Sequence, residues 1–283
     1  YWEWLAAGQG YRIAETLLKT ALDRAAALEQ QVAEGDIERI VLVDNQRLVL
    51  SRQAKLIEAD QKLQTSAIKL SLFLRTPQGE PVVPPRDALP ESFPAPEPLD
   101  PGRLHSDLNE ALARRPEVRQ LNLLRRQLEV DLALAQNQCL PTIDAAMNAS
   151  QDLGGATNSK DDKGELILEA GLVGEVPLQR REAAGTSRAL QAKIAQNMAK
   201  LRFARDKISA EVAAAYAAVL ATYEQYQRAA DAVHLNRETE AFERQKLAVG
   251  ESNLLLLNLR EQATADAALT EVYALLAFYQ ALA

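Results

Sequence analysis

The chain has 283 residues, of which 47% are hydrophobic and 25% are charged, so its composition is that of a folded protein and excludes a wholly disordered one. The formal net charge is −7, from 32 basic and 39 acidic residues, and this acidic balance argues against nucleic-acid binding. A single cysteine, Cys139, excludes an internal disulfide, and no run approaches the roughly 18 apolar residues of a transmembrane helix.

The first predicted element is a helical hairpin over residues 1–75, which contain no proline. Gly35 divides it, because glycine readily adopts the left-handed conformation that ends a helix. Tyr1 is preceded by no initiator Met and no signal sequence, and it falls inside what reads as a helix. We therefore expect the chain to be a fragment, with the first part of a first repeat missing.

A non-helical connector is predicted over residues 76–103, where nine of the 12 prolines lie. Helical composition then resumes over 104–140, with Pro116 suited to a first helical turn.

Two strands are predicted next, over 142–151 and 165–177, because apolar and polar residues alternate there with a period of two. The intervening loop, 152–164, is rich in turn-forming residues. Each strand is close to the 9–11 residues that cross a bilayer at a tilt. Residue pattern alone leaves two readings open, a segment of a membrane barrel and a hairpin on a soluble protein.

A long helix is predicted over 178–249, since no proline interrupts it. At about 1.5 Å per residue, some 70 helical residues would extend on the order of 100 Å. A seam with alternating spacings of four and three predicts coiled-coil packing. Its members are Ile194, Met198, Leu201, Arg205, Ile208, Val212, Ala215, Val219, Thr222, Tyr226, Ala229 and Val233.

A second turn is predicted at 250–251, followed by a return helix over 252–283, for which Ser252 or Glu251 can supply the N-cap. This hairpin repeats the first one. A shift of 215 residues places Gly35 on Gly250 without gaps, and it also matches Tyr1 with Tyr216 and Tyr11 with Tyr226. We interpret this as an internal duplication, in which residues 104–283 form the second repeat.

Signatures of enzymes are missing from the sequence, which has no phosphate-binding glycine loop, nucleophile elbow or metalloprotease motif. His105 and His234 lie far apart without metal-ligand spacing. We therefore expect no enzymatic activity, no cofactor and no metal.

Taken in order, these elements resemble the TolC-like outer-membrane efflux proteins (outer membrane factors). The residues that carry the resemblance are Arg115-Pro-Glu-Val, Leu140-Pro141 before a strand, Val176-Pro-Leu after a strand, Ala213-Ala-Ala-Tyr216, Val249-Gly250, and Gly35 followed by Val43-Asp-Asn-Gln46. The resemblance covers nearly the whole chain. It implies a mainly α fold of long antiparallel hairpins, a coiled-coil α-barrel with a short two-stranded membrane β-barrel segment.

The resemblance further implies a homotrimer in the bacterial outer membrane whose helical part lies in the periplasm and whose connector is equatorial. The channel would conduct small solutes passively to the exterior, and its tip would meet a periplasmic adaptor protein linked to an inner-membrane pump. The tip residues would be Gly35, Asp36, Val249, Gly250, Glu251 and Ser252, with Asp44 as a candidate gate. Lumen-facing strand residues would be Asp144, Asn148, Glu165, Glu169 and Glu175. Lipid-facing ones would be Ile143, Met147, Leu166, Leu168 and Leu172.

Two other classes of protein remain open at this stage. A soluble coiled-coil scaffold explains the seam and the hairpins but not the paired alternating strands. A periplasmic adaptor protein also carries a long helical hairpin, but it would have one hairpin among many strands rather than two hairpins and two strands. The sequence names neither the exported compound nor the adaptor.

Overall fold

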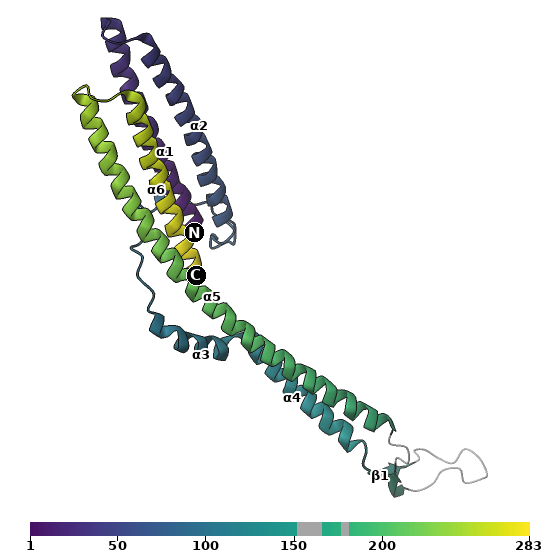
Figure 1. The fold of residues 1–283 in the computed structure, drawn as a ribbon. Coiled ribbons are helices and arrows are strands. Elements are labelled where there is room, and N and C mark those ends of the chain that lie inside the picture. Colours follow the sequence, from purple (N-terminus) through teal and green to yellow (C-terminus); the bar gives the residue numbers. More distant parts are fainter. Residues whose placement is uncertain (152–165, 177–180) are drawn as a thin grey trace. The chain divides into compact units, whose positions relative to one another are not determined.

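The structure is a computed structural model that describes residues 1–151, 166–176 and 181–283. Apart from two short 3-10 helices, Arg86–Ala88 and Pro101–Arg103, the regular structure of these residues consists of α-helices and one pair of strands (Figure 1). In chain order they are α1 (Trp2–Glu34), α2 (Arg39–Leu70), α3 (Leu104–Arg114), α4 (Pro116–Asn137), β1 (Thr142–Ser150), β2 (Ile167–Glu175), α5 (Arg181–Ala248) and α6 (Leu254–Leu282). The predicted fold class, mainly α with a small antiparallel pair of strands, is confirmed.

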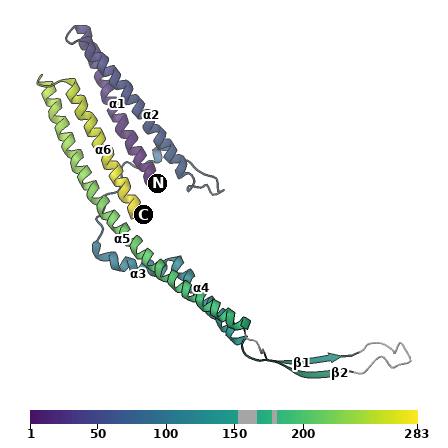
Figure 2. The same ribbon diagram turned by 45° about the vertical axis from the view of Figure 1, so that its right-hand side comes forward.

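The chain folds into two compact units. The first unit combines Tyr1–Leu104 with Ala213–Ala283, and the second is His105–Val212. In the first unit, α1, α2, α6 and the later part of α5 run side by side (Figure 2). Residues far apart in sequence therefore meet there, because α1 packs on both α2 and α6.

The two hairpin turns of the first unit have the same hydrogen bonds, displaced by 215 residues. Gly35 has φ 82° and Gly250 has φ 79°, both left-handed. The N–H of Asp36 donates to the carbonyl of Gln31 at 2.9 Å, and the N–H of Glu251 donates to that of Lys246 at 2.9 Å. These bonds satisfy carbonyl groups at the end of each ascending helix. The return helices α2 and α6 also start 215 residues apart, which supports the duplication.

The predicted N-cap of the return helix is wrong. Asn253, not Ser252 or Glu251, caps α6, because its side-chain oxygen accepts a hydrogen bond from the N–H of Leu256 at 3.0 Å. The hydroxyl of Ser252 instead donates to the carboxylate of Glu243 on α5. A polar residue close to a helix start can also hydrogen-bond to the preceding helix. The local backbone conformation determines which of the two bonds its side chain makes.

The connector packs against the end of the first unit that lies away from the turns. Gly8 in α1 permits this approach, since a Cβ there would lie 2.2 Å from a methyl group of Leu89. Arg12 donates hydrogen bonds to the carbonyl oxygens of Glu91 at 2.7 Å and Pro90 at 3.1 Å.

Aromatic rings reinforce the same end of the unit. The ring of Trp2 stacks on that of Tyr279, with centroids 4.3 Å apart, and the ring of Phe93 stacks on both. Burial raises the pKa of the Tyr279 hydroxyl, which donates to the carbonyl of Pro94 at 2.9 Å. The connector is therefore tied to both α1 and α6.

In the second unit, α3 and α4 pack against the first part of α5. Its core contains Val118, Leu201 and Ile208. The helical region predicted over 104–140 consists of two helices that meet at Arg115, whose ψ of 126° is extended because the next residue is Pro116. Pro116 then occupies the first turn of α4.

The predicted seam of α5 is only partly right. Leu201, Ile208, Val219, Ala229 and Val233 are buried, but Met198 is 46% exposed and Arg205 is also exposed. Asn197 replaces Met198 in the core, where its amide donates to the carbonyl of Leu121 at 2.9 Å. Counting apolar residues missed this position, because a buried amide can donate to a backbone carbonyl, although the Oδ1 of Asn197 has no partner.

The strands β1 and β2 pair antiparallel, with Thr142 opposite Glu175 and Ser150 opposite Ile167. Every residue in both strands is exposed on either face. The predicted positions Glu165 and Pro177, like the loop 152–164, lie outside the described residues.

Candidate functional site

The register of the two strands gathers the predicted polar positions on one face and the predicted apolar positions on the other. Residues that are directly opposite in an antiparallel pair share a face. Asn148 is opposite Glu169, and the pairs Asp144–Val173 and Thr142–Glu175 fall on the same face. The sequence predicted alternation in each strand, but only the register shows that the two patterns coincide.

The opposite face carries most of the large apolar side chains, whereas Ile167 and Val173 lie on the polar face. Met147 is opposite Ala170, and the pairs Ala145–Leu172 and Ala149–Leu168 follow the same alternation. The exposed fractions are 76% for Ile143, 80% for Met147, 62% for Leu168 and 78% for Leu172. Leu166, just before β2, is 57% exposed, whereas Glu165 lies outside the described residues. This face is therefore an apolar surface that nothing in the described chain covers.

The predicted tip residues lie at the two turns, which are at the same end of the first unit (Figures 1 and 2). Gly35 and Asp36 form one turn, and Val249–Ser252 form the other. Val249 is 72% exposed. Because the two turns lie at the same end of the unit, their residues can form one contact surface. Contact of this surface with an adaptor protein stays a prediction.

Asp44, the candidate gate, lies on α2 near its turn. Its side chain is 68% exposed and its carboxylate is 3.9 Å from the guanidinium of Arg47. It lines a cavity of about 920 Å³ with residues of both hairpins. The structure thus places Asp44 on an open surface near the tip.

A buried ion cluster that the sequence did not reveal joins the two hairpins. Its centre is Glu261 of α6, whose side chain is only 2% exposed. Arg52 of α2, 1% exposed, donates to this carboxylate at 3.0 Å, and Arg24 of α1 donates to its other oxygen. Arg24 also donates to the side-chain oxygen of Asn258. Three helices thus supply one charged cluster.

The surroundings of the cluster satisfy most of its polar atoms. Arg52 donates to the carbonyl of Leu17 at 2.7 Å, although its Nε has no partner. Arg244 of α5, which is 59% exposed, lies 3.8 Å from Glu261. No local motif predicts this cluster, because Arg52 and Glu261 are 209 residues apart.

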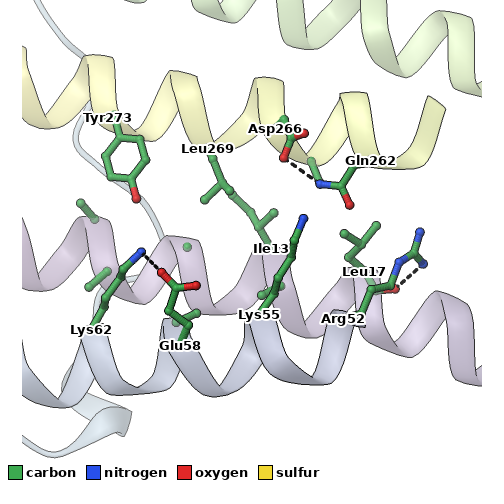
Figure 3. A pocket seen from close by; sticks show the side chains of 16 residues that line it. Ile13, Leu17, Arg52, Lys55, Glu58, Lys62, Gln262, Asp266, Leu269 and Tyr273 are labelled. Atoms are coloured by element: carbon green, nitrogen blue, oxygen red, sulfur yellow. Dashed lines mark hydrogen bonds and ion pairs between the residues drawn. The ribbon is translucent and has the colours of Figure 1, made fainter. Parts of the chain in front are cut away.

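A groove beside the cluster runs between α2 and α6, with α1 beneath it (Figure 3). Its volume is about 220 Å³, and Ile13, Leu17 and Leu269 form part of its apolar lining. On α2, the ammonium of Lys62 is 2.7 Å from the carboxylate of Glu58. This hydrogen bond lowers the pKa of Glu58 and raises that of Lys62.

In the described part of the chain, no three His, Cys, Asp or Glu side chains are grouped so that they could hold a metal ion. Across residues 1–151, 166–176 and 181–283, no helix combines the length and the apolar character needed to cross a membrane.

Comparisons with solved structures show that several bacterial outer-membrane channels share this fold. The channel CmeC from Campylobacter jejuni matches the whole chain with a TM-score of 0.72 and 11% identity. VceC from Vibrio cholerae matches with a TM-score of 0.73 and 16% identity, and MtrE from Neisseria gonorrhoeae, in its open state, with 0.73 and 19%. At such identities the likeness shows the fold, and the chain has the TolC-like fold that its sequence resembles.

The chain covers only part of each of these proteins, 59% of CmeC, 67% of VceC and 64% of MtrE. No family model matches the sequence, and no curated protein matches it.

Proposed function

We propose that this chain is part of a trimeric outer-membrane channel of the TolC-like efflux family, a passive conduit for small solutes from the periplasm to the exterior. The observation that carries the proposal is the β1–β2 pair, which is apolar on one face and polar on the other. Its residues are all exposed, and within the described chain neither strand has a second partner.

Such a pair is not stable alone. Two-stranded hairpins are marginally stable in water, and unpaired strand edges attract further strands. Closure with strands from other parts of the assembly would satisfy both edges. Lipid would then cover the exposed apolar side chains and remove them from water; these are Ile143, Met147, Leu166, Leu168 and Leu172.

The polar face would line the lumen. Glu169 and Glu175 lie on this face with Asp144 and Asn148, and Glu165 would extend it. Carboxylates in a channel favour cations and polar solutes over anions. We therefore propose an electronegative lining rather than a site for one particular compound.

In the first unit, the two glycine turns would form the periplasmic tip. Val249, Gly250, Glu251 and Ser252, together with Gly35 and Asp36, would contact a periplasmic adaptor protein linked to an inner-membrane pump. The high exposure of Val249 supports this assignment, since a contact surface needs accessible apolar groups. Asp44 would act near the same end as a gate, with its charge toward the solute path.

A pair of matched arginine variants in the full-length parent protein tests the assignment of faces. Leu168→Arg with Leu172→Arg places two charges on the proposed lipid face, at roughly 2–4 kcal/mol for each arginine at the bilayer midplane. Ile167→Arg with Val173→Arg places the same two charges on the opposite face of the same strand.

We expect the first variant to be lost from the outer-membrane fraction and the second to assemble as the parent does. Equal assembly of both variants, or loss of the second alone, would overturn the proposed faces.

A further inference from the structure

The groove between α2 and α6 has a floor of small side chains (Figure 3). Ala7, Gly10 and Ala14 of α1 line it with helical spacings of three and four. A Cβ at Gly10 would meet a methyl group of Leu269 at 3.5 Å, which is an ordinary contact distance, so the packing of the helices does not require a glycine here. The open volume of about 220 Å³ lies below the roughly 300–1,000 Å³ of pockets for drug-sized molecules. The groove therefore has room only for a small ligand.

Charged side chains of α2 and α6 line the same groove. There are five of them, Arg52, Lys55, Glu58, Lys62 and Asp266. Three already have partners of opposite charge. The ammonium of Lys62 lies 2.7 Å from the carboxylate of Glu58. Arg52 donates to Glu261 of the ion cluster at 3.0 Å. Lys55 and Asp266 remain, one on each wall of the groove.

These two side chains form no ion pair with any residue that the structure describes. The pKa of Glu58 is lowered mainly by its hydrogen bond with Lys62, and Lys55 adds the smallest contribution, from a longer distance. Asp266 accepts a hydrogen bond from the neutral amide of Gln262 at 2.7 Å. Figure 3 shows Lys55 extending from α2 toward the side of α6, where Asp266 and Gln262 lie. The groove thus presents an unpaired cation on one wall and an unpaired carboxylate on the other.

A buried donor at the end of the groove also lacks a partner. Arg52 is 1% exposed, and its Nε has no acceptor among the described residues, although its other nitrogens bind Leu17 and Glu261. A buried donor without an acceptor is destabilising, because it has lost its hydrogen bond to water. Lys55 follows Arg52 by three residues, a spacing that places both on one side of α2. An oxygen atom at this end of the groove would therefore find two donors.

We infer that this groove binds a zwitterionic small molecule with an apolar side chain, of the size of a single α-amino acid. Lys55 and the Nε of Arg52 receive its carboxylate, and Asp266 accepts hydrogen bonds from its ammonium group. The apolar side chain lies on the floor formed by Gly10 and Ala14. A ligand with one charge fits less well, since an anion is repelled by Asp266 and a cation by Lys55.

The second repeat does not reproduce this site. The residues equivalent to Gly10 and Lys55 are Gln225 and Thr270, so neither the open floor nor the cation recurs there. All residues that line the groove belong to the first unit of one chain. The inference therefore goes beyond the proposed channel and does not depend on the number of copies, and it gives one ligand for each chain.

Equilibrium dialysis of radiolabelled L-phenylalanine against the full-length parent protein in detergent tests the inference. Two unlabelled competitors separate the charges, since phenylpropionate lacks the ammonium group and phenylethylamine lacks the carboxylate. Lys55→Met and Asp266→Asn each remove one wall charge at nearly constant side-chain size. Lys69→Met is the matched control, because it removes a lysine of the same helix that does not line this groove.

We expect saturable binding of one L-phenylalanine for each chain, and a dissociation constant about tenfold higher in each wall variant, because each loses a charge-assisted hydrogen bond. Each competitor should bind about tenfold more weakly than L-phenylalanine for the same reason, and Lys69→Met should bind as the parent does. No saturable binding by the folded parent, equal affinity for a competitor, or unchanged affinity in either wall variant would overturn the inference.

Single-channel conductance of the same preparation separates this inference from the proposed function. A parent that conducts but does not bind L-phenylalanine overturns the inference alone. A parent that binds L-phenylalanine with the expected losses in the two wall variants supports the inference, whether or not it conducts.

Discussion

Glu261→Gln is the substitution that most directly tests the buried ion cluster. The amide preserves the size of the side chain but removes its charge, so Arg52, 1% exposed, loses its ionic partner. Removing one member of a buried pair costs about 3–5 kcal/mol, because the remaining charge stays buried and uncompensated. Arg24, whose side chain is 13% exposed, loses a partner as well, which favours the upper part of that range.

The expected change is large enough for a thermal or denaturant measurement. The first unit contains 175 residues, Tyr1–Leu104 and Ala213–Ala283. For a unit of this size each kcal/mol shifts the melting temperature by about 2–4 °C, so we expect a fall of about 6–20 °C. Circular dichroism of the full-length parent protein in detergent follows the loss of helix, and guanidinium titration gives the change in free energy.

Two further variants make the result specific. Asp44→Asn removes a carboxylate from an exposed pair, 3.9 Å from Arg47, and should change stability by about 0–1 kcal/mol. The triple variant Arg24→Met, Arg52→Met, Glu261→Leu replaces the cluster with apolar side chains and should be more stable than Glu261→Gln alone. A loss below about 1 kcal/mol for Glu261→Gln would refute the reasoning, because it would mean that water reaches the cluster.

Three smaller effects follow from other parts of the first unit. Gly250→Ala places a side chain at φ 79° and should cost about 1–2 kcal/mol in guanidinium unfolding; an unchanged midpoint would mean that the turn adopts another conformation. Gly8→Ala should make the connector more susceptible to limited proteolysis, and adding Leu89→Ala should restore protection; no rescue would contradict the packing. Glu58 has a lowered pKa, so the stability it contributes is present above its ordinary value of 4.5 and is lost as the pH falls through the lowered value. In an NMR titration Lys62→Met should return the pKa of Glu58 to the ordinary range, and an unaltered midpoint would assign the shift to another group.

The features that the sequence predicted correctly are those set by local chemistry. Gly35 and Gly250 end their helices because only a left-handed residue allows the observed hydrogen bonds, and glycine adopts that conformation without strain. The alternation in β1 and β2 was also visible, since a period of two needs no knowledge of the rest of the chain.

The features that the sequence did not predict depend on distant partners. Asn197 is buried because the carbonyl of Leu121 accepts its hydrogen bond, and this pairing has no sequence signal. The cluster around Glu261 likewise needs residues from three helices. In the first repeat, the residue equivalent to Glu261 is Gln46, which is uncharged. Comparison of the two repeats therefore gives no indication of the cluster.

Single-channel conductance of the full-length parent protein in a planar bilayer tests the central claim most directly. We expect stable steps of conductance that favour cations, because the carboxylates of Glu169 and Glu175 share the polar face of the strands. A protein that stays water-soluble and produces no conductance would contradict the channel and leave a coiled-coil scaffold as the better explanation of the helical seams.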